Sequence, residues 1–208
     1  MSGRFITLEG GEGAGKSTQI RALAQALRDR GLEIVETREP GGSAGAEAIR
    51  ALLLTGSAER WHPRAEALLF AAARADHLDK TILPALERGA WVVCDRFIDS
   101  SRAYQSGGSG LADADILTLH SIGSKGLMPD RTLVLTLPEA EANARAMARD
   151  SGVADRIGAR DPAYHRKVAD AFAGYARQDP DRVRLIDGTG AAPEVTVRLM
   201  TAISDLLP

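Results

Sequence analysis

The run from Gly10 to Ser17 limits what this 208-residue chain can fold into more than any other feature. It reads Gly-Gly-Glu-Gly-Ala-Gly-Lys-Ser and fits the pattern G-x-x-x-x-G-K-[ST]. A strand-like run, Phe5 to Glu9, precedes it, and apolar residues at helical spacing follow between Ile20 and Leu27. In this setting glycines let backbone N–H groups converge on phosphate oxygens, and the helix start adds its positive end. The run therefore predicts a nucleoside triphosphate site.

Single residues of this loop have definite expected roles. Lys16 is expected to reach the β- and γ-phosphates, and the Ser17 hydroxyl is expected to ligate Mg²⁺. A dinucleotide-binding fingerprint is excluded, because it would need a third glycine where Lys16 stands. The predicted ATP-binding residues are Gly10, Gly11, Glu12, Gly13, Ala14, Gly15, Lys16, Ser17 and Thr18.

Strand-like and helix-like segments alternate along the whole chain. Further strands are expected at 33–35, 91–94, 132–137 and 183–186, and further helices at 44–54, 64–88 with a kink at Pro84, from about 138, and near the end. The pattern predicts an α/β fold of the P-loop NTPase type, with a doubly wound, parallel, five-stranded sheet flanked by helices. Two glycine- and serine-rich stretches, 106–110 and 121–126, are expected to be loops.

Composition excludes several classes of protein. The chain is 44% hydrophobic and 26% charged, which is typical of a single globular domain spanning residues 1–208. A net charge of −2 argues against nucleic-acid binding, and the longest apolar run, Ala67 to Ala73, is too short to span a membrane. The single cysteine, Cys94, and the absence of a signal-peptide pattern predict a cytoplasmic protein. The four histidines show no metal-ligand spacing.

The strand that ends at Cys94 leads directly into Asp95 and Arg96. An acidic residue at the end of a buried strand beside a phosphate loop is the usual holder of Mg²⁺ or its water shell, so Asp95 joins Ser17 as a predicted metal residue. Arg96 is expected to face the same crevice. Downstream, no N-K-x-D motif marks a guanine-specific switch.

The segment from Asp95 to Gln105 resembles the signature of the thymidylate (dTMP) kinases, D-R-[FYH]-x-x-S-[ST]-x-A-[YF]-Q. Four other segments resemble the same family in the same order: 37–42, 50–54, 68–74 and 155–157. The resemblance implies a homodimeric enzyme that transfers the γ-phosphoryl group of MgATP to dTMP, giving dTDP and ADP for DNA precursor synthesis. Two alternatives stay open: another nucleoside or nucleotide kinase, and a P-loop ATPase or regulatory nucleotide-binding protein.

Several residues are suited to binding a nucleotide base. Phe70 and Arg74 are four residues apart and share a helix face, so the ring can stack on a pyrimidine while the guanidinium donates to a carbonyl oxygen. Gln105 offers an amide to the remaining edge. The resemblance gives these residues the same roles against thymine. It also places Tyr104 under the sugar, where it excludes a 2′-hydroxyl, and Ser101 beside the nucleotide.

Cations are needed to bring two polyanionic nucleotides together, and arginine binds phosphate with two prongs. The resemblance implies that Arg38 and Arg96 hold the acceptor phosphate, with Arg50 close by, and that Glu39 lies near the sugar 3′-hydroxyl.

A cluster of arginines, Arg145, Arg149, Arg156 and Arg160, predicts a lid at about 145–160 that closes over ATP. The acidic Glu12 in the loop resembles the bacterial subtype, in which lid arginines supply the catalytic charge. The predicted catalytic residues are Lys16, Arg96, Arg149 and Arg156. Gly158 stands where family members often have glutamate, so no ligand is assigned there.

Overall fold

A parallel sheet forms the centre of the molecule in the computed structural model, which describes residues 3–138, 140–142, 144–145 and 155–208. Within these residues the sheet has five strands in the order β2-β3-β1-β4-β5, and each neighbouring pair is parallel. The predicted sheet is confirmed. The strands are β1 (Phe5–Gly10), β2 (Ile34–Arg38), β3 (Trp91–Asp95), β4 (Arg131–Thr136) and β5 (Val183–Asp187).

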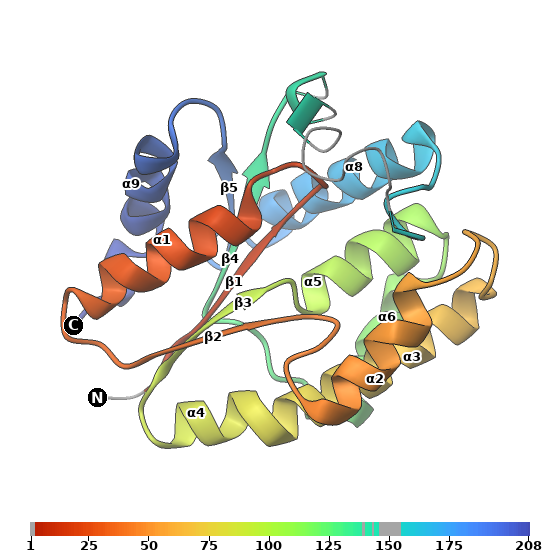
Figure 1. Cartoon of the computed structure of the whole chain (residues 1–208), viewed down its shortest axis with the longest axis horizontal. Helices are drawn as coiled ribbons and strands as arrows, with labels where there is room; N and C mark the ends of the chain where they lie inside the picture. The colour runs from red at the N-terminus through yellow and green to blue at the C-terminus, as the bar shows by residue number, and fades with distance from the viewer. Residues whose placement is uncertain (1–2, 139, 143, 146–154) are drawn as a thin grey trace.

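Helices cover both faces of the sheet (Figure 1). One face carries α1 (Lys16–Arg28) and α9 (Ala192–Ala202). The other face is covered by α3 (Pro63–His77), α4 (Leu83–Glu87), α5 (Ile98–Ser101), α6 (Asp113–Ser124) and α8 (Pro162–Gln178), while α2 (Ala44–Leu54) packs on α3. The chain closes with a 3₁₀ turn at Ser204–Leu206.

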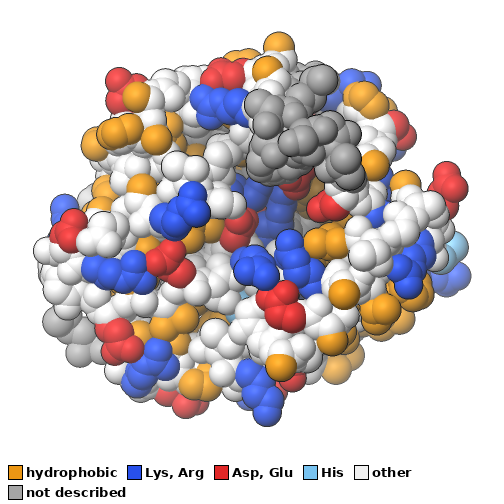
Figure 2. All heavy atoms as spheres, in the orientation of Figure 1, with side chains coloured by type: hydrophobic (Ala, Val, Ile, Leu, Met, Phe, Trp, Pro, Cys, Tyr) orange, Lys and Arg blue, Asp and Glu red, His pale blue; other side chains and the backbone are white. Residues whose placement is uncertain are grey.

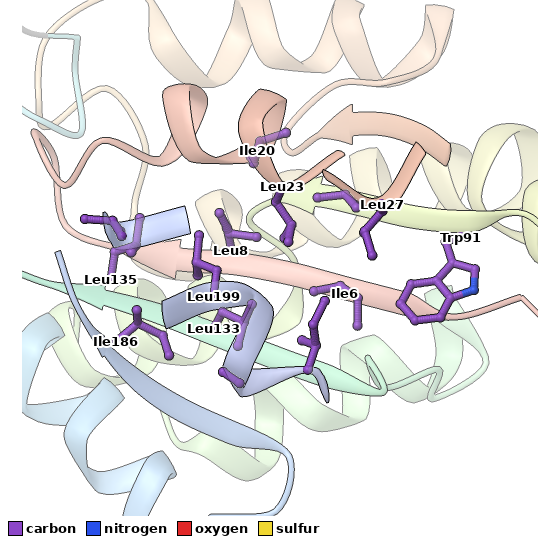
Figure 3. Packing of buried hydrophobic residues seen from close by; sticks show 14 of the residues in the cluster. Ile6, Leu8, Ile20, Leu23, Leu27, Trp91, Leu133, Leu135, Ile186 and Leu199 are labelled. Carbon is purple, nitrogen blue, oxygen red and sulfur yellow. The ribbon is translucent and has the colours of Figure 1, made fainter. Parts of the chain in front are cut away.

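Alternating side chains of β1 supply both cores. Ile6 and Leu8 point to the α1 face and pack with Leu23 of α1 and Leu199 of α9 (Figure 3), whereas Phe5 points to the opposite face. All five side chains are almost fully buried. Burial of each stabilises the fold by about 1.5–3 kcal/mol. These two cores hold the carboxyl ends of the strands, where ligands of such sheets bind, in fixed positions.

The predicted helix at 64–88 is interrupted. α3 ends at His77, a π-helical turn follows at Leu78–Ile82, and α4 begins at Leu83. Pro84 has no backbone N–H and cannot continue an α-helical ladder, so the interruption lies where the sequence predicts a kink.

The expected loop at 121–126 is wrong for its first four residues, which belong to α6. Packing explains this difference, because α6 lies against α3, and a Cβ on Gly123 would meet Ala71 and Ala75 of α3 at an ordinary contact distance of 3.6 Å. The helix therefore continues through residues whose composition is typical of a loop. The expected loop at 106–110 is also partly helical, since a π-helical segment spans Arg102–Gly108.

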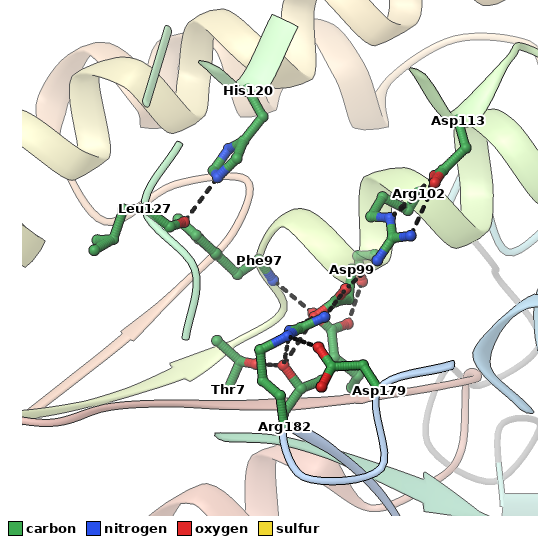
Figure 4. A network of polar contacts seen from close by, with 12 residues as sticks. Thr7, Phe97, Asp99, Arg102, Asp113, His120, Leu127, Asp179 and Arg182 are labelled. Atoms are coloured by element: carbon green, nitrogen blue, oxygen red, sulfur yellow. Dashed lines mark hydrogen bonds and ion pairs between the residues drawn. The ribbon is translucent and has the colours of Figure 1, made fainter. Parts of the chain in front are cut away.

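A buried carboxylate, Asp99, fixes the start of this segment to the sheet (Figure 4). Its oxygens accept hydrogen bonds from Arg182, Arg102 and Thr132 at 2.6–3.2 Å. Arg102 also pairs with Asp113 of α6 at 2.8 Å. A fully paired buried carboxylate of this kind holds its neighbours in a single arrangement. None of the described helices has the length and apolar character needed to cross a membrane.

Candidate active site

The glycine loop bends sharply between β1 and α1. Gly10 and Gly15 have φ angles of 129° and 85°, and a Cβ on Gly10 would clash with the carbonyl oxygen of Leu135. α1 begins at Lys16, whose ammonium donates to the carbonyl oxygens of Gly10 and Gly11 at 3.2 and 2.9 Å. Burial, together with the charge of Arg96, lowers the pKa of Lys16. The side chain of this first helical residue is therefore held against the glycine loop.

Ser17 and Asp95 lie together at the edge of this loop. The Ser17 hydroxyl is 3.5 Å from one carboxylate oxygen of Asp95, and the other oxygen is buried without a hydrogen-bond partner among the described residues. Hydroxyl and carboxylate oxygens are ligands that Mg²⁺ accepts alongside phosphate and water. The donor set thus fits the predicted metal. The described residues contain no group of three or more acidic, histidine or cysteine side chains that could hold an ion unaided.

One cleft of about 660 Å³ opens above the carboxyl ends of the strands. Figure 2 shows lysine and arginine side chains gathered around a hollow on this face. The cleft brings together most of the residues predicted from the sequence: Glu12, Gly13, Ala14, Gly15, Lys16, Ser17, Thr18, Arg38, Glu39, Arg50, Phe70, Arg74, Asp95, Arg96, Ser101, Tyr104 and Gln105. Gly10 and Gly11 do not line the cleft, but their carbonyl oxygens accept hydrogen bonds from Lys16.

Arg96 reaches the cleft from a strained turn after β3. Its φ angle of 67° is rare for a residue with a side chain, and its N–H donates to the Leu8 carbonyl at 3.0 Å. Its guanidinium donates to Glu12 at 2.8 Å and to Ser100 at 3.1 Å. The turn is thus tied to β1 by its backbone and to the glycine loop by its side chain.

Glu9, the residue immediately before the loop, supports the same turn from behind. One carboxylate oxygen accepts from the backbone N–H of Phe97 at 2.8 Å, and the other accepts from the Ser100 hydroxyl. The side chain is fully buried, and burial raises its pKa to about 7 against the lowering effect of Arg96.

Arg74 is held rigidly at the base of the cleft. Its Nε donates to Glu39 at 2.7 Å, and its Nη2 donates to Ser101 at 2.8 Å and to the Phe97 carbonyl at 3.2 Å. The second oxygen of Glu39 lies 3.1 Å from Nδ1 of His77. Both oxygens of Glu39 are therefore engaged by protein groups, so the carboxylate positions Arg74 in addition to lining the cleft.

Three aromatic residues, Phe70, Phe97 and Tyr104, line the cleft. Phe70 is half-buried on α3, one turn before Arg74. The ring of Tyr104 lies 4.9 Å below the guanidinium carbon of Arg96, and its buried hydroxyl has no hydrogen-bond partner among the described residues. Burial raises the pKa of Tyr104 to about 12, so the hydroxyl keeps its proton near neutral pH.

Two further arginines stand at the mouth of the cleft. Arg38 is exposed and pairs with Glu47 at 3.0 Å, and Arg50 donates to the Pro40 carbonyl at 2.6 Å. A hydrogen bond from the Gly42 N–H to Glu47 lowers the pKa of that carboxyl, so Glu47 stays ionised opposite Arg38. Both guanidiniums retain donors for a phosphate.

The predicted lid residues have different outcomes. Arg149 lies outside the described residues. Arg156 does not line the cleft: it is almost fully buried and donates to Glu66 at 2.5 Å and to the carbonyls of Leu53 and Ala58 at 2.6 and 3.1 Å. Arg145 does line the cleft, close to Gly15.

Sequence reasoning missed Glu66, His77 and the support that Glu9 gives to Arg96. His77 follows Arg74 by three residues, and such spacing on a helix was a usable signal. Glu66 shares the face of Phe70 and Arg74 by the same rule, but nothing in the sequence indicates that Gln105, Arg156 and Arg160 converge on it.

A family model for thymidylate kinase matches residues 8–198 of the chain. This chain belongs to the thymidylate kinase family. It is 62% identical over 208 residues to the thymidylate kinase of Rhizorhabdus wittichii, with each chain covered completely. It is 48% identical over 207 residues to that of Bradyrhizobium sp. strain BTAi1, covering 99% of this chain and 91% of that one. Like other members of the thymidylate kinase family, it is an enzyme that phosphorylates dTMP to dTDP.

The fold agrees with a solved thymidylate kinase structure. The crystal structure of the Ehrlichia chaffeensis thymidylate kinase superposes with a TM-score of 0.76 at 30% identity, covering 98% of this chain and 99% of that one. The family uses ATP as phosphoryl donor. The expected family, fold and activity are thus confirmed, whereas the roles of single residues stay predictions.

Proposed function

We propose that this chain transfers the γ-phosphoryl group of MgATP to dTMP within the single cleft described above. The observation that supports this most is that one continuous cleft joins the glycine loop to Phe70, Arg74, Tyr104 and Gln105. A donor nucleotide at the loop and an acceptor nucleotide at these residues then meet end to end. The acceptor phosphate is already anionic near neutral pH, so positioning and charge stabilisation carry the reaction.

The cationic residues divide this work between donor and acceptor. Lys16 binds the β- and γ-phosphates when ATP displaces its contacts with the loop carbonyls. Arg96 and Arg38 bind the acceptor phosphate and align its oxygen with the γ-phosphorus, and Arg50 adds charge at the mouth. Arg145 faces the donor side, where it can stabilise charge on the transferring group.

The base and sugar are recognised by the other end of the cleft. Phe70 stacks on the thymine ring, Arg74 donates to a carbonyl oxygen of the base, and Gln105 reads the adjacent edge. Tyr104 lies under the sugar and leaves no room for a 2′-hydroxyl. Ser101 borders the nucleotide while accepting the hydrogen bond from Arg74.

Ser17 and Asp95 are the residues that would hold Mg²⁺ with the ATP phosphates. When bound, the ion neutralises charge on the phosphates. The Asp95 oxygen that has no hydrogen-bond partner among the described residues supports this assignment.

Three further features belong to the proposal. Residues 1–208 form one domain in which about 145–160 act as a lid over ATP. The enzyme is a cytoplasmic homodimer, and exposed apolar side chains on the packed helices α3 and α6, Leu68 and Ile122, support a contact between two copies. Light scattering of the intact chain and of Ile122→Glu tests the dimer, since the charge is expected to yield monomers.

The acceptor assay tests the proposed substrates. Purified chain with MgATP is mixed in turn with dTMP, dUMP, UMP, dCMP and dGMP, and ADP is measured. We expect ADP to form fastest with dTMP and negligibly without an acceptor. ADP release that is independent of acceptor would favour an ATPase, and a preference for dCMP or dGMP would overturn the assignment of the base site.

A further inference from the structure

A buried carboxylate lies directly behind the proposed base site. Glu66 of α3 is fully buried and does not line the cleft, whereas its neighbour Gln105 does. One oxygen of Glu66 accepts a hydrogen bond from the side-chain Nε2 of Gln105 at 3.0 Å. The other oxygen accepts from Arg156 at 2.5 Å and from Arg160 at 2.6 Å. Donors thus surround both oxygens.

This carboxylate has little freedom to move. The other nitrogens of Arg156 donate to the carbonyl oxygens of Leu53 and Ala58. Arg160 donates to Ser109 at 3.0 Å, and its guanidinium carbon lies 4.5 Å from the centre of the Tyr164 ring. Two anchored guanidiniums facing one oxygen keep the carboxylate in place, and leave its other oxygen aimed at Gln105. Such fully satisfied buried networks specify one arrangement.

The contact decides which way the Gln105 amide faces. A side-chain amide has a donor end and an acceptor end, and an ionised carboxylate only accepts. The NH₂ of Gln105 therefore faces Glu66, and its carbonyl oxygen, at the opposite end, is left for the cleft. Among the described residues, the only side-chain hydrogen bond of Gln105 is the one that its amide nitrogen donates to Glu66.

Arg74 supplies the complementary group. Its Nε and Nη2 are used by Glu39, Ser101 and the Phe97 carbonyl, so Nη1 is the nitrogen left to donate. An acceptor beside a donor matches a pyrimidine whose N3 carries hydrogen and whose C4 carries oxygen. Cytosine presents the reverse pattern at these two atoms.

We propose that Glu66 is a positioning residue that fixes the Gln105 amide and so makes the site prefer pyrimidines with an N3–H and a C4 carbonyl over cytosine. This inference rests on the base site of the proposed function. Glu66 acts without touching the nucleotide. In Glu66→Gln the partner offers both a donor and an acceptor, so the orientation of Gln105 is no longer enforced.

The test compares kcat/KM for dTMP and dCMP in Glu66→Gln, in Gln105→Leu and in the double variant. We expect Glu66→Gln to raise the KM for dTMP by roughly ten-fold with kcat nearly unchanged, and to lower the dTMP-to-dCMP ratio by about ten-fold or more. In the Gln105→Leu background, adding Glu66→Gln should leave the ratio within about two-fold, because the group it positions is gone.

Two further variants keep the test decisive. Glu66→Asp retains the charge that the arginines need for folding but shortens the reach to Gln105, and it is expected to lower the ratio as well. Glu87→Gln, which removes an exposed glutamate on α4, is the matched control and should change nothing. Thermal unfolding of each variant is measured in parallel.

The outcomes distinguish the positioning role of Glu66 from the placement of the base site. If Gln105→Leu leaves the ratio unchanged, the base site itself is misplaced. If Gln105→Leu lowers the ratio while folded Glu66→Gln and Glu66→Asp do not, the positioning role is overturned and the proposed function stands. Equal effects of Glu66→Gln with and without the Gln105 amide would also overturn it.

Discussion

The guanidinium of Arg96 lies 2.8 Å from the carboxylate of Glu12, so the turn proposed to hold the acceptor is paired with the loop proposed to hold the donor. This ion pair is only partly exposed, which makes it stronger than an ordinary surface pair. Glu12 follows β1 and Arg96 follows β3, and these neighbouring parallel strands end at the same edge of the sheet. The acceptor and donor halves of the site are therefore joined by a side-chain contact.

Glu12→Ala removes that contact. We expect the KM for dTMP to rise by about ten-fold, because Arg96 loses its anchor and must be ordered by the ligand. Steady-state kinetics measures the effect. Glu36→Ala, which removes a glutamate side chain of the same exposure that pairs with Arg28 away from the cleft, should leave the KM unchanged. An unaltered KM in Glu12→Ala would mean that the turn alone positions Arg96.

Lys16→Ala should depress turnover with every acceptor by roughly 100-fold or more, because the lost ammonium stabilises phosphate charge and not the acceptor. Rates with dTMP and dUMP under saturating substrates measure this. Lys80→Ala removes an exposed lysine and serves as control. A loss restricted to one acceptor would place Lys16 on the wrong nucleotide.

Tyr104→Ala should relax discrimination between dUMP and UMP by about ten-fold, because the space under the sugar opens. Tyr104→Phe removes only the hydroxyl and keeps the ring that lies below Arg96, so it is expected to retain the discrimination. The ratio of kcat/KM for the two acceptors is the measurement. Selectivity that survives in Tyr104→Ala would remove this residue from the scheme.

Glu9 predicts a pH dependence of stability. Its carboxyl has a pKa of about 7 in the folded chain, because of burial, against 4.5 in the unfolded chain. Between these values the folded chain binds the extra proton, so the free energy of unfolding falls as pH rises. The total fall from this group is about 3 kcal/mol, complete above the folded pKa.

Glu9→Gln lacks this titration and should show a correspondingly flatter curve in chemical denaturation between about pH 5 and pH 8. Glu36→Gln, an exposed control, is expected to follow the parent chain. Parallel curves for Glu9→Gln and the parent would show that Glu9 keeps an ordinary pKa. The charges facing Glu9 are those of Arg96 and Asp99, which the variant leaves in place.

Arg156→Ala separates a structural role from the predicted catalytic one. Removing one partner of a buried ion pair costs about 3–5 kcal/mol, so a marked loss in thermal stability is expected. Arg184→Ala, which affects a half-exposed arginine, is the control and should lose far less. If stability is kept while kcat falls, Arg156 acts as the lid residue that the sequence predicted.

The sequence predicts the parts of this molecule that depend on local pattern. A strand, a glycine run and a helix in succession place Lys16 and Ser17, and helical spacing places Phe70 with Arg74. The resemblance to a family adds Tyr104 and Gln105 from a segment whose π-helical course no periodicity indicates. These residues are gathered in one cleft because parallel strands end at the same edge.

The parts that escape prediction are those set by packing between distant segments. Arg156 belongs to the arginine-rich segment that predicts a lid. Its guanidinium nevertheless donates to the carbonyl oxygens of Leu53 and Ala58, which lie far earlier in the chain. Gly123 lies in a stretch with the composition of a loop, yet it belongs to α6, which packs against Ala71 and Ala75 of α3. Long-range contacts of this kind leave no trace in local spacing.

The left-handed backbone at Arg96 has a consequence for anyone who engineers this enzyme. Arg96→Gly would relieve the backbone strain and would be an obvious substitution for raising thermal stability. The same substitution deletes the guanidinium that pairs with Glu12 of the glycine loop and that is proposed to hold the acceptor phosphate. If Arg96 holds the acceptor as proposed, stability and turnover compete at this position, and gains in thermal stability are better sought elsewhere in the chain.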